Sequence, residues 1–475
     1  MSDLRLALAA LAVAATGCLP SLVENPAREV SRAVPKSFAR DETPPTQDNF
    51  ARHDWRDFFT SPELRALIDT ALKNNQELNV RVQEIIIAQN EVAARRGEYL
   101  PKVSAGLGTG IEKVGGYTSR GFADKATGVP ENLGNFQFGL TASWEIDVWG
   151  KLRNAAQAAD FRWRASVEGR NFMVTQLVAE LARSYYELIA LDNELEVLER
   201  NIEIQQRALE VVRLEKQAAR VTELAVQRFE AEVLKNRSRL FELQQERVQA
   251  ENRINFLVGR FPQPVARDAR QFDAPLPETL QAGVPSELLE NRPDVRAAEL
   301  ELEAAKLDVS VAKARFFPAL SIDAAVGYQS FNLAHLVSTP ESLLYNLAGN
   351  LVAPLLNRAG IEADYRSANA RQIQAVFNYE RALLQAFTDV ANQLARYDNL
   401  QKAWALQARQ VDVLGQSVEV STVLFQSARA DYMEVLLTRR DSLDAQLELL
   451  ETKKRLLLST VDLYQALGGG WRPAT

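Results

Sequence analysis

One unit of sequence occurs twice in this chain, and each copy joins very long helical patterns to short alternating segments. In the first copy an apolar-periodic stretch begins at Val80 and ends shortly before Pro101; in the second a similar stretch begins at Val295 and ends before Pro318. Two strand patterns and a longer helical pattern follow each proline. Because a period of roughly 210 residues is too long for a solenoid repeat, we infer one internal duplication.

The helical patterns are long and carry heptad spacing. Apolar residues recur at spacings of three and four from Val226 to Leu257, with Asn236 and Arg247 as the exceptions, and again from residue 383 to residue 411. Residues 151–218 contain no proline, so one helix over them would be about 100 Å long at about 1.5 Å per residue. The final helix has two adjacent apolar columns, which predicts a wall of helices rather than a simple pair.

Proline and glycine residues predict where several helices begin. Pro62 stands in a favoured first-turn position, and we expect its helix to run to about Arg96. Turns at Gly150 and Gly360 are expected to precede the two longest helices.

Four segments alternate apolar and polar residues, at about 101–111, 136–147, 319–329 and 344–354. Each has about ten residues, the length that a tilted strand needs to cross a bilayer. Aromatic residues flank the apolar faces as a possible interfacial girdle: Phe136, Trp144, Tyr328 and Tyr345. A half-buried soluble sheet has the same alternation, and the export signal described next favours the membrane.

The N-terminus has the features of an export signal. Residues 4–15 form an apolar run interrupted only by Arg5, and small residues lead to Cys18. This arrangement resembles a bacterial lipobox, so we expect Cys18 to be acylated and to become the mature N-terminus. A plain cleavable signal with a bystander cysteine is the alternative. The predicted location is the bacterial outer membrane, both lipid-anchored and spanning, with a periplasmic extension.

Composition argues against several other functions. The net charge of −7 offers no basic surface for nucleic acid. His53, His335 and Cys18 are too few for a His/Cys metal cluster, and no Gly-rich phosphate loop is present. The strand carboxylates Glu145, Asp147 and Asp323 are more simply lumen-facing polar residues than a catalytic set. We therefore expect neither an enzyme nor a cofactor.

A physical constraint on membrane sheets predicts an oligomer. Backbone groups at an open sheet edge cannot be left unpaired in lipid, and four strands per chain cannot close a barrel, since the smallest have about eight. Two chains would give about eight strands and a filled interior, whereas three would give about twelve and a lumen. A conduit requires the wider barrel.

Three motifs stand out in the sequence: GVPSELLENRPDVRAAE at 283–299, DVWGKLR at 147–153 and LYQALGGGW at 463–471. They resemble signatures of the outer-membrane efflux proteins, and more narrowly of the TolC-like lipoprotein branch that serves RND-type multidrug pumps. The resemblance runs from Cys18 to Trp471. It implies a mostly α fold with a membrane β part: a homotrimer with a long periplasmic α-helical barrel, a 12-stranded outer-membrane β-barrel and an equatorial belt. It also implies outer-membrane lipid, a periplasmic adaptor (membrane fusion) protein and an inner-membrane RND-type transporter as partners.

The resemblance and the proline-rich segments together predict the domain plan. We expect a signal peptide at 1–17, a lipidated N-terminal tether and equatorial segment at 18–61, a first structural repeat at 62–260, a Pro-rich equatorial crossing at 261–285, a second structural repeat at 286–467 and a C-terminal equatorial tail at 468–475.

The resemblance also places candidate working residues at the periplasmic tip, where two helix-to-helix turns are expected. Similar turns in the family contact the adaptor, which makes Arg220, Thr222, Glu223 and Arg429 docking candidates. Thr222 also suits an N-cap position. Solvated turn chemistry is the alternative for all four.

Acidic rings often constrict the tunnel of family members just inside this tip. Glu434 occupies one such position, whereas Leu437 stands where an aspartate is common. We hypothesise a gate that combines a carboxylate ring at Glu434 with an apolar ring at Leu437, next to Asp431, which pairs with Glu434 in a capping-box-like start of the last helix. A plain surface glutamate is the alternative. Alanines, Ala219 and Ala428, replace the turn glycines of the family.

These observations predict the channel component of a tripartite efflux system, a passive gated duct that exports small molecules such as drugs. A duct for type I protein secretion or metal efflux is the alternative within the same class. A coiled-coil lipoprotein that tethers the outer membrane would also be helical, exported and acylated, but the alternating strands in both copies argue against it.

Overall fold

The protein is described by a computed structural model at residues 26–35, 37–38, 49, 52–275, 282–427 and 429–472. The predicted signal peptide and Cys18 lie outside these residues. The chain divides into two compact units, each assembled from distant stretches of sequence. The first contains 85–165 and 298–379, and the second contains 52–84, 166–297 and 380–472. Both units therefore draw on both sequence copies.

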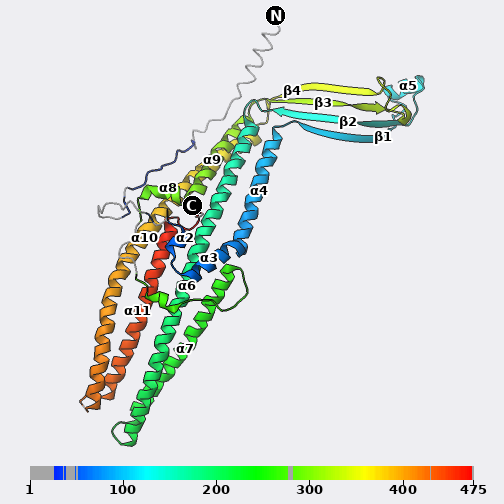
Figure 1. Ribbon diagram of the computed structural model, residues 1–475. Coiled ribbons are helices and arrows are strands. Elements are labelled where there is room, and N and C mark those ends of the chain that lie inside the picture. Colours follow the sequence, from blue (N-terminus) through cyan, green and yellow to red (C-terminus); the bar gives the residue numbers. More distant parts are fainter. Residues whose placement is uncertain are drawn as a thin grey trace. The chain divides into compact units, whose positions relative to one another are not determined.

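The elements follow the duplicated order of the sequence (Figure 1). The first copy contains α2 (Trp55–Phe58), α3 (Pro62–Asn74), α4 (Gln76–Glu98), β1 (Lys102–Glu112), α5 (Ser119–Ala126), β2 (Leu133–Ile146), α6 (Lys151–Gln217) and α7 (Glu223–Val258). The crossing and second copy contain η2 (Ala269–Asp273), η3 (Pro285–Glu287), α8 (Leu288–Asn291), α9 (Pro293–Ala314), β3 (Ala319–Ser330), η4 (Leu333–His335), β4 (Leu343–Val352), α10 (Ala359–Gln426) and α11 (Tyr432–Ala466).

The long helices occur as predicted. α6 has 67 residues and α10 has 68, each without a break. The polar exception in the α7 heptads, Asn236, is buried and donates a hydrogen bond of 2.9 Å to Gln205 of α6. A single polar pair of this kind fixes the register of two packed helices.

Two helix boundaries differ from the prediction. The helix expected from Pro62 to Arg96 is interrupted at Asn75, whose backbone is extended. The Asn75 side chain accepts a hydrogen bond from the Leu78 amide and donates one to the Leu257 carbonyl, so it caps α4 and turns the chain. The expected turn at Gly360 is also wrong, because Gly360 lies inside the first turn of α10, and the left-handed residue before this helix is Asn357 (φ 54°). Gly150, by contrast, has φ 72° as a turn requires.

The four strands form one antiparallel sheet in the order β1-β2-β3-β4. The register aligns the apolar faces that the alternation predicted. Rows that run across the sheet are Leu107, Phe138, Tyr328 and Leu343; Ala105, Leu140, Val326 and Tyr345; and Val103, Ala142, Ala324 and Leu347. The rings of Phe138 and Tyr328 stack at 5.4 Å. One face of the sheet is thus apolar over its whole width.

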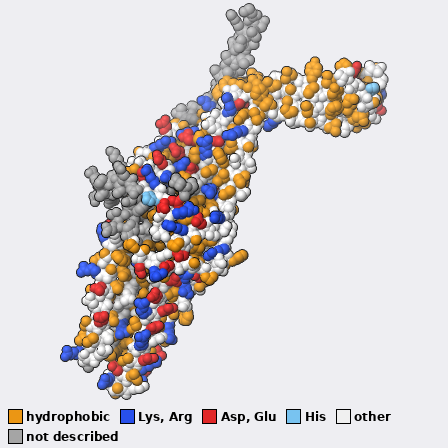
Figure 2. Space-filling view, viewed as in Figure 1, with side chains coloured by type: hydrophobic (Ala, Val, Ile, Leu, Met, Phe, Trp, Pro, Cys, Tyr) orange, Lys and Arg blue, Asp and Glu red, His pale blue; other side chains and the backbone are white. Residues whose placement is uncertain are grey.

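That apolar face is open to the surroundings in the single chain. Leu107 is 84% exposed, Tyr345 81% and Leu347 76%. Hydrophobic side chains gather over the strands in Figure 2. Such an extended apolar surface marks contact with lipid or another protein, and it removes the half-buried soluble alternative.

Among the helices that the structure describes, none has the combination of length and apolarity needed to span a membrane.

The DVWGKLR motif makes the turn from β2 into α6. The Asp147 carboxylate accepts hydrogen bonds from the amides of Leu152 (3.1 Å) and Arg153 (2.9 Å) at the helix start. Trp149 donates to the Pro318 carbonyl at 2.8 Å and stacks on Phe317. The motif therefore ties the end of β2 to the start of β3.

The other two motifs meet each other. Arg292, almost fully buried, pairs with Asp294 at 2.6 Å and with Asp389 of α10 at 3.1 Å, and donates to the Ala466 carbonyl. Gly468 has φ 84° and lies so close to the Asn291 carbonyl that a Cβ would sit 2.4 Å from its oxygen. These contacts join the start of the second copy to the chain's C-terminal end.

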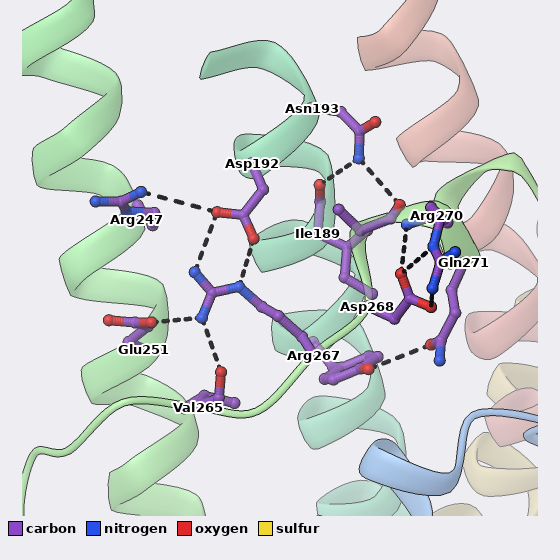
Figure 3. A network of polar contacts seen from close by, with 12 residues as sticks. Ile189, Asp192, Asn193, Arg247, Glu251, Val265, Arg267, Asp268, Arg270 and Gln271 are labelled. Atoms are coloured by element: carbon purple, nitrogen blue, oxygen red, sulfur yellow. Dashed lines mark hydrogen bonds and ion pairs between the residues drawn. The ribbon is translucent and has the colours of Figure 1, made fainter. Parts of the chain in front are cut away.

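A further polar network fastens the Pro-rich crossing to the helices (Figure 3). Arg267 pairs with both carboxylate oxygens of Asp192 on α6 and with Glu251 on α7 at 2.5 Å. Its guanidinium also donates to the Val265 carbonyl at 2.9 Å, and Arg247 lies 4.0 Å from Asp192. The hydrogen bond to Asp192 raises the pKa of Arg267 above its ordinary value. Little of these side chains is exposed, at 16% for Arg267 and 19% for Asp192.

We predict that Arg267→Met destabilises the protein by about 3 kcal/mol, because two poorly solvated carboxylates lose their counter-charge. Thermal melts of the purified protein measure this. The matched control is Arg270→Met in the same segment, where a 90% exposed side chain pairs with Asp268 at the surface and its loss should leave the melt unchanged. Equal melts for both variants would contradict the assignment.

Candidate functional site

The two helix-to-helix turns predicted to form the tip lie side by side. Residues 218–222 connect α6 to α7, and residues 427–431 connect α10 to α11. A shared apolar cluster joins the first two turns of α7 to the start of α11; it contains Val226 and Phe229 from α7, with Val221 and Tyr432 packed against them. The Arg228 guanidinium also contacts the Met433 sulfur at 3.3 Å. The structure therefore brings the candidate docking and gate residues into one region.

The first turn is a Schellman motif built without glycine. The Arg220 amide donates to the Glu215 carbonyl and the Ala219 amide to the Lys216 carbonyl, both at 2.9 Å. Ala219 takes the left-handed conformation, with φ 57°. Glycine is the usual residue there because a Cβ is strained in this region.

The second turn closes in a similar way. The Arg429 amide donates to the Leu424 carbonyl at 2.9 Å, which is the long hydrogen bond of the same motif. Ala428 lies outside the described residues.

The four docking candidates differ in their surroundings. Arg220 and Arg429 are exposed, and within the described part of the chain neither has a carboxylate within ion-pair distance. Glu223 is exposed too, but it pairs with Lys216 across the turn. Thr222 occupies the N-cap of α7 as predicted, yet its side chain makes no capping hydrogen bond. The two arginines are therefore the candidates whose charge is available for an ion pair with a partner protein.

The gate candidates lie on one face of α11. Glu434 and Leu437 both line a groove between α10 and α11, and Leu437 is 40% exposed. Asp431 is exposed at the N-cap of α11, one turn below. The expected capping box does not form, because the Asp431 side chain accepts no capping hydrogen bond and only its carbonyl accepts one, from the Glu434 amide at 3.1 Å.

Sequence reasoning missed a second carboxylate in this groove. Asp441 lies seven residues after Glu434, so it recurs on the same face of α11, and it also lines the groove. The heptad spacing from Glu434 was the signal that could have found it. An adjacent arginine, Arg440, pairs with Asp441 at 3.2 Å.

The opposite face of α11 carries a half-buried cation, Arg439. Its Nε is buried without a hydrogen-bond partner among the described residues, and desolvation lowers the pKa of the guanidinium. Arg439 lines an apolar groove with Val211 of α6, Phe425 of α10 and Tyr432. This groove separates the α6 and α10 helices just above the turns.

Among the described residues there is no group of three or more His, Cys, Asp or Glu side chains that could hold a metal ion.

Comparison with known proteins decides the family. A profile of the outer membrane efflux protein family matches residues 67–260 and 284–469, which include both sequence copies. The chain belongs to this family. It is 31% identical to the pyoverdine export outer membrane protein OpmQ of Pseudomonas aeruginosa over 422 residues, which cover 88% of this chain and 87% of OpmQ.

Other relatives and solved structures agree with this result. The cation efflux system protein CusC of Escherichia coli is 27% identical over 99% of this chain and all of its own length. The probable outer membrane lipoprotein SilC of Salmonella typhimurium is 26% identical over 92% of this chain and 93% of its own. The open-state structure of the Neisseria gonorrhoeae MtrE outer membrane channel superposes with a TM-score of 0.83 at 26% identity, covering 94% of this chain and 98% of MtrE.

The family membership confirms the predicted class and location. The protein is an outer-membrane efflux channel of the kind used in tripartite pumps, with long periplasmic helices and a membrane β part. Its family consists of ducts rather than enzymes. The tethering-lipoprotein alternative loses its support.

We predict that Ala219→Gly stabilises the tip by about 1 kcal/mol, because it removes the strain of a left-handed alanine. Amide hydrogen exchange of residues 215–223 should slow in the variant. Ala218→Gly is the matched control. Ala218 itself does not have a positive φ, so glycine at this position should speed exchange instead. Faster exchange in both variants would show that the turn is not strained.

Proposed function

We propose that the protein is a passive, gated duct that works as a homotrimer and exports small molecules delivered by an inner-membrane pump. The supporting observation is the four-stranded sheet, whose outer strands β1 and β4 each have an unpaired edge beside an apolar face. Such edges must be paired inside a bilayer. Three copies would join β4 of each to β1 of the next and give a barrel of about twelve strands with an open lumen.

The relatives bear on the cargo. OpmQ is named for pyoverdine export, and CusC for cation efflux. The greater identity to OpmQ favours organic small molecules such as drugs, with metal efflux as the second candidate. A periplasmic adaptor protein and an RND-type transporter complete the proposed assembly, as the family resemblance implies; the sequence itself contains no Gly-rich phosphate loop.

Mass measurement and planar-bilayer recording of the full-length purified protein test this proposal. We expect a trimer that conducts, and a denatured mass that includes acyl chains on Cys18, as proposed for a lipid anchor. A monomer or dimer that never conducts would reject the duct. A conducting trimer of unmodified mass would reject only the anchor.

We further propose that Glu434 and Leu437 form the gate, with Asp431 below them. Glu434 is exposed in the groove between α10 and α11, and a threefold axis would gather three such carboxylates into a ring. Charged rings of this kind attract cations.

Glu434→Gln should therefore reduce the cation preference of the conducting trimer, measured as the reversal potential in a salt gradient across a planar bilayer. The matched control is Glu242→Gln, an exposed glutamate on α7 far from the tip, which should leave the reversal potential unchanged. Unaltered cation selectivity in Glu434→Gln would contradict the proposed carboxylate ring.

Arg220 and Arg429, which have no ion-pair partner among the described residues, are proposed to dock the adaptor together with Thr222 and Glu223. Arg220→Glu/Arg429→Glu should lower drug export in cells at least tenfold, a loss of about 1.4 kcal/mol in binding, while trimer formation and conductance of the purified protein persist. The control Arg200→Glu changes a 69% exposed arginine on α6 that pairs with its helix neighbour Glu196. Full export by the double variant would remove both arginines from the docking surface.

A further inference from the structure

All the charged residues of the described strands lie on the polar face of the sheet. They are Lys102 and Glu112 of β1, Glu145 of β2 and Asp323 of β3. Side chains alternate between the two faces of a strand, and the register assigns these four positions to the polar rows. In the proposed barrel the apolar face contacts lipid, so the polar face lines the lumen.

Two of these charges are neutralised by neighbouring side chains. Glu145 pairs with Lys151 of α6 at 2.5 Å, at the end of the sheet that adjoins the helices. Glu112 pairs with Arg120 of α5 at 3.1 Å, at the opposite end. Neither pair has a net charge, so neither end of the lumen face gains an uncompensated charge from these carboxylates.

The other two charges, Lys102 and Asp323, share one row of the sheet. Ser143 lies between them in the register, so two strand spacings of about 4.8 Å separate them by about 10 Å. Neither has an ion-pair partner among the described residues. The Asn350 side chain donates a hydrogen bond of 2.8 Å to the Asp323 carboxylate, which orients the carboxylate without neutralising it.

Between this row and Glu112 the lumen face has no charge. The uncharged section extends from Ser104 to Gly110 of β1, about 20 Å along the strand. Its rows consist of small or neutral residues: Ser104, Thr141, Ala325 and Asn346; Gly106, Gly139, Gly327 and Leu344; Gly108, Gln137 and Gln329; and Gly110 and Asn135. Within the described strands, the row of Lys102 and Asp323 is therefore the level where uncompensated charges face the lumen.

We propose that Lys102 and Asp323 form two rings of opposite charge at the periplasmic end of the β-barrel, which compensate each other and let cargo of either charge pass. The proposal rests on the proposed trimer and identifies the residues that set charge selection in its barrel. Threefold symmetry would place the three Lys102 side chains at one height and the three Asp323 side chains at another. For strands tilted by about 40°, a separation of about 10 Å across the strands gives about 6 Å along the barrel axis.

The dimensions of such a barrel allow each ring to act on passing ions. Twelve strands about 4.8 Å apart and tilted by about 40° give a backbone radius of about 12 Å. Inward side chains then lie within about 10 Å of the axis, which is one Debye length at about 0.1 M salt. A single charged ring would therefore select ions by their sign. Two opposite rings about 6 Å apart produce opposing potentials that largely cancel.

Reversal potentials of the full-length trimer in planar bilayers test the two rings. The parent chain contains Glu434→Gln, so that the proposed tip ring does not contribute, and a salt gradient near about 0.01 M extends the Debye length to about 30 Å. Asp323→Asn should raise the anion preference of the parent about threefold, and Lys102→Gln should raise its cation preference by a similar factor. The double variant Lys102→Gln/Asp323→Asn should return to the potential of the parent.

Ser143→Asn is the matched control. It enlarges an uncharged side chain in the same row, between the two charges, and should leave the potential unchanged. A rescue provides a second measurement: Asp323→Cys should behave like Asp323→Asn, and labelling with a negatively charged thiol reagent should restore the potential of the parent. The same reagent applied to the parent controls for labelling of Cys18.

The outcomes separate the rings from the duct. Conducting trimers whose potentials are unchanged in both single variants would overturn the rings and leave the duct intact. Shifts of both single variants in the same direction, or a double variant that does not return to the parent potential, would overturn the compensation. A parent chain that forms no trimer and never conducts would overturn the rings and the proposed duct together.

Discussion

Backbone hydrogen bonding in the sheet is the constraint on which the rest of the architecture depends. The ladder pairs every neighbour from β1 to β4 and leaves two edges, while one face of all four strands is apolar. In lipid these edges must be hydrogen-bonded to further strands, so the four strands of one chain cannot span a membrane alone. The helices outside the sheet show the same division, since α7 and α10 each bury one apolar face within the chain and expose another. Strands and helices therefore both present apolar surface that the chain itself does not bury.

The three sequence motifs have a structural role, because their residues connect the ends of helices and strands. Asp147 caps α6 where β2 ends, and Trp149 reaches the carbonyl before β3. Arg292 binds carboxylates from two helices and a carbonyl at the end of α11, and Gly468 permits the close approach beside it. The residues proposed for docking and gating, in contrast, lie in exposed turns and on one exposed helix face. Fold and recognition are carried by different parts of the chain.

The elements were largely predictable, and the reasons for the exceptions are local. Heptad spacing and the absence of proline were sufficient for α6 and α10. Pro62 was correctly predicted as a helix start, but the helix ends early at Asn75, whose side chain donates a hydrogen bond to the distant Leu257 carbonyl. The helix propensities of the residues in this segment cannot predict a contact with a residue so far away in the sequence. Thr222 and Asp431 took their N-cap positions without making the capping hydrogen bonds. At the candidate site Glu434 and Leu437 were found through the family resemblance, whereas Asp441 was recognised only in the structure, where it lines the same groove.

The sequence by itself determined which residues form helices and strands, because periodicity records which side of each element must leave water. It also determined the family, through motifs that act as joints. Only the tertiary structure decided that Asn291 meets Gly468, that the two turns share one apolar cluster, and that Leu234, Phe241 and Val248 remain uncovered while neighbouring heptad positions are buried. The physical reason is that an apolar stripe looks the same in sequence whether its partner belongs to its own chain or to another; only the packing of the chain shows which stripes are already occupied.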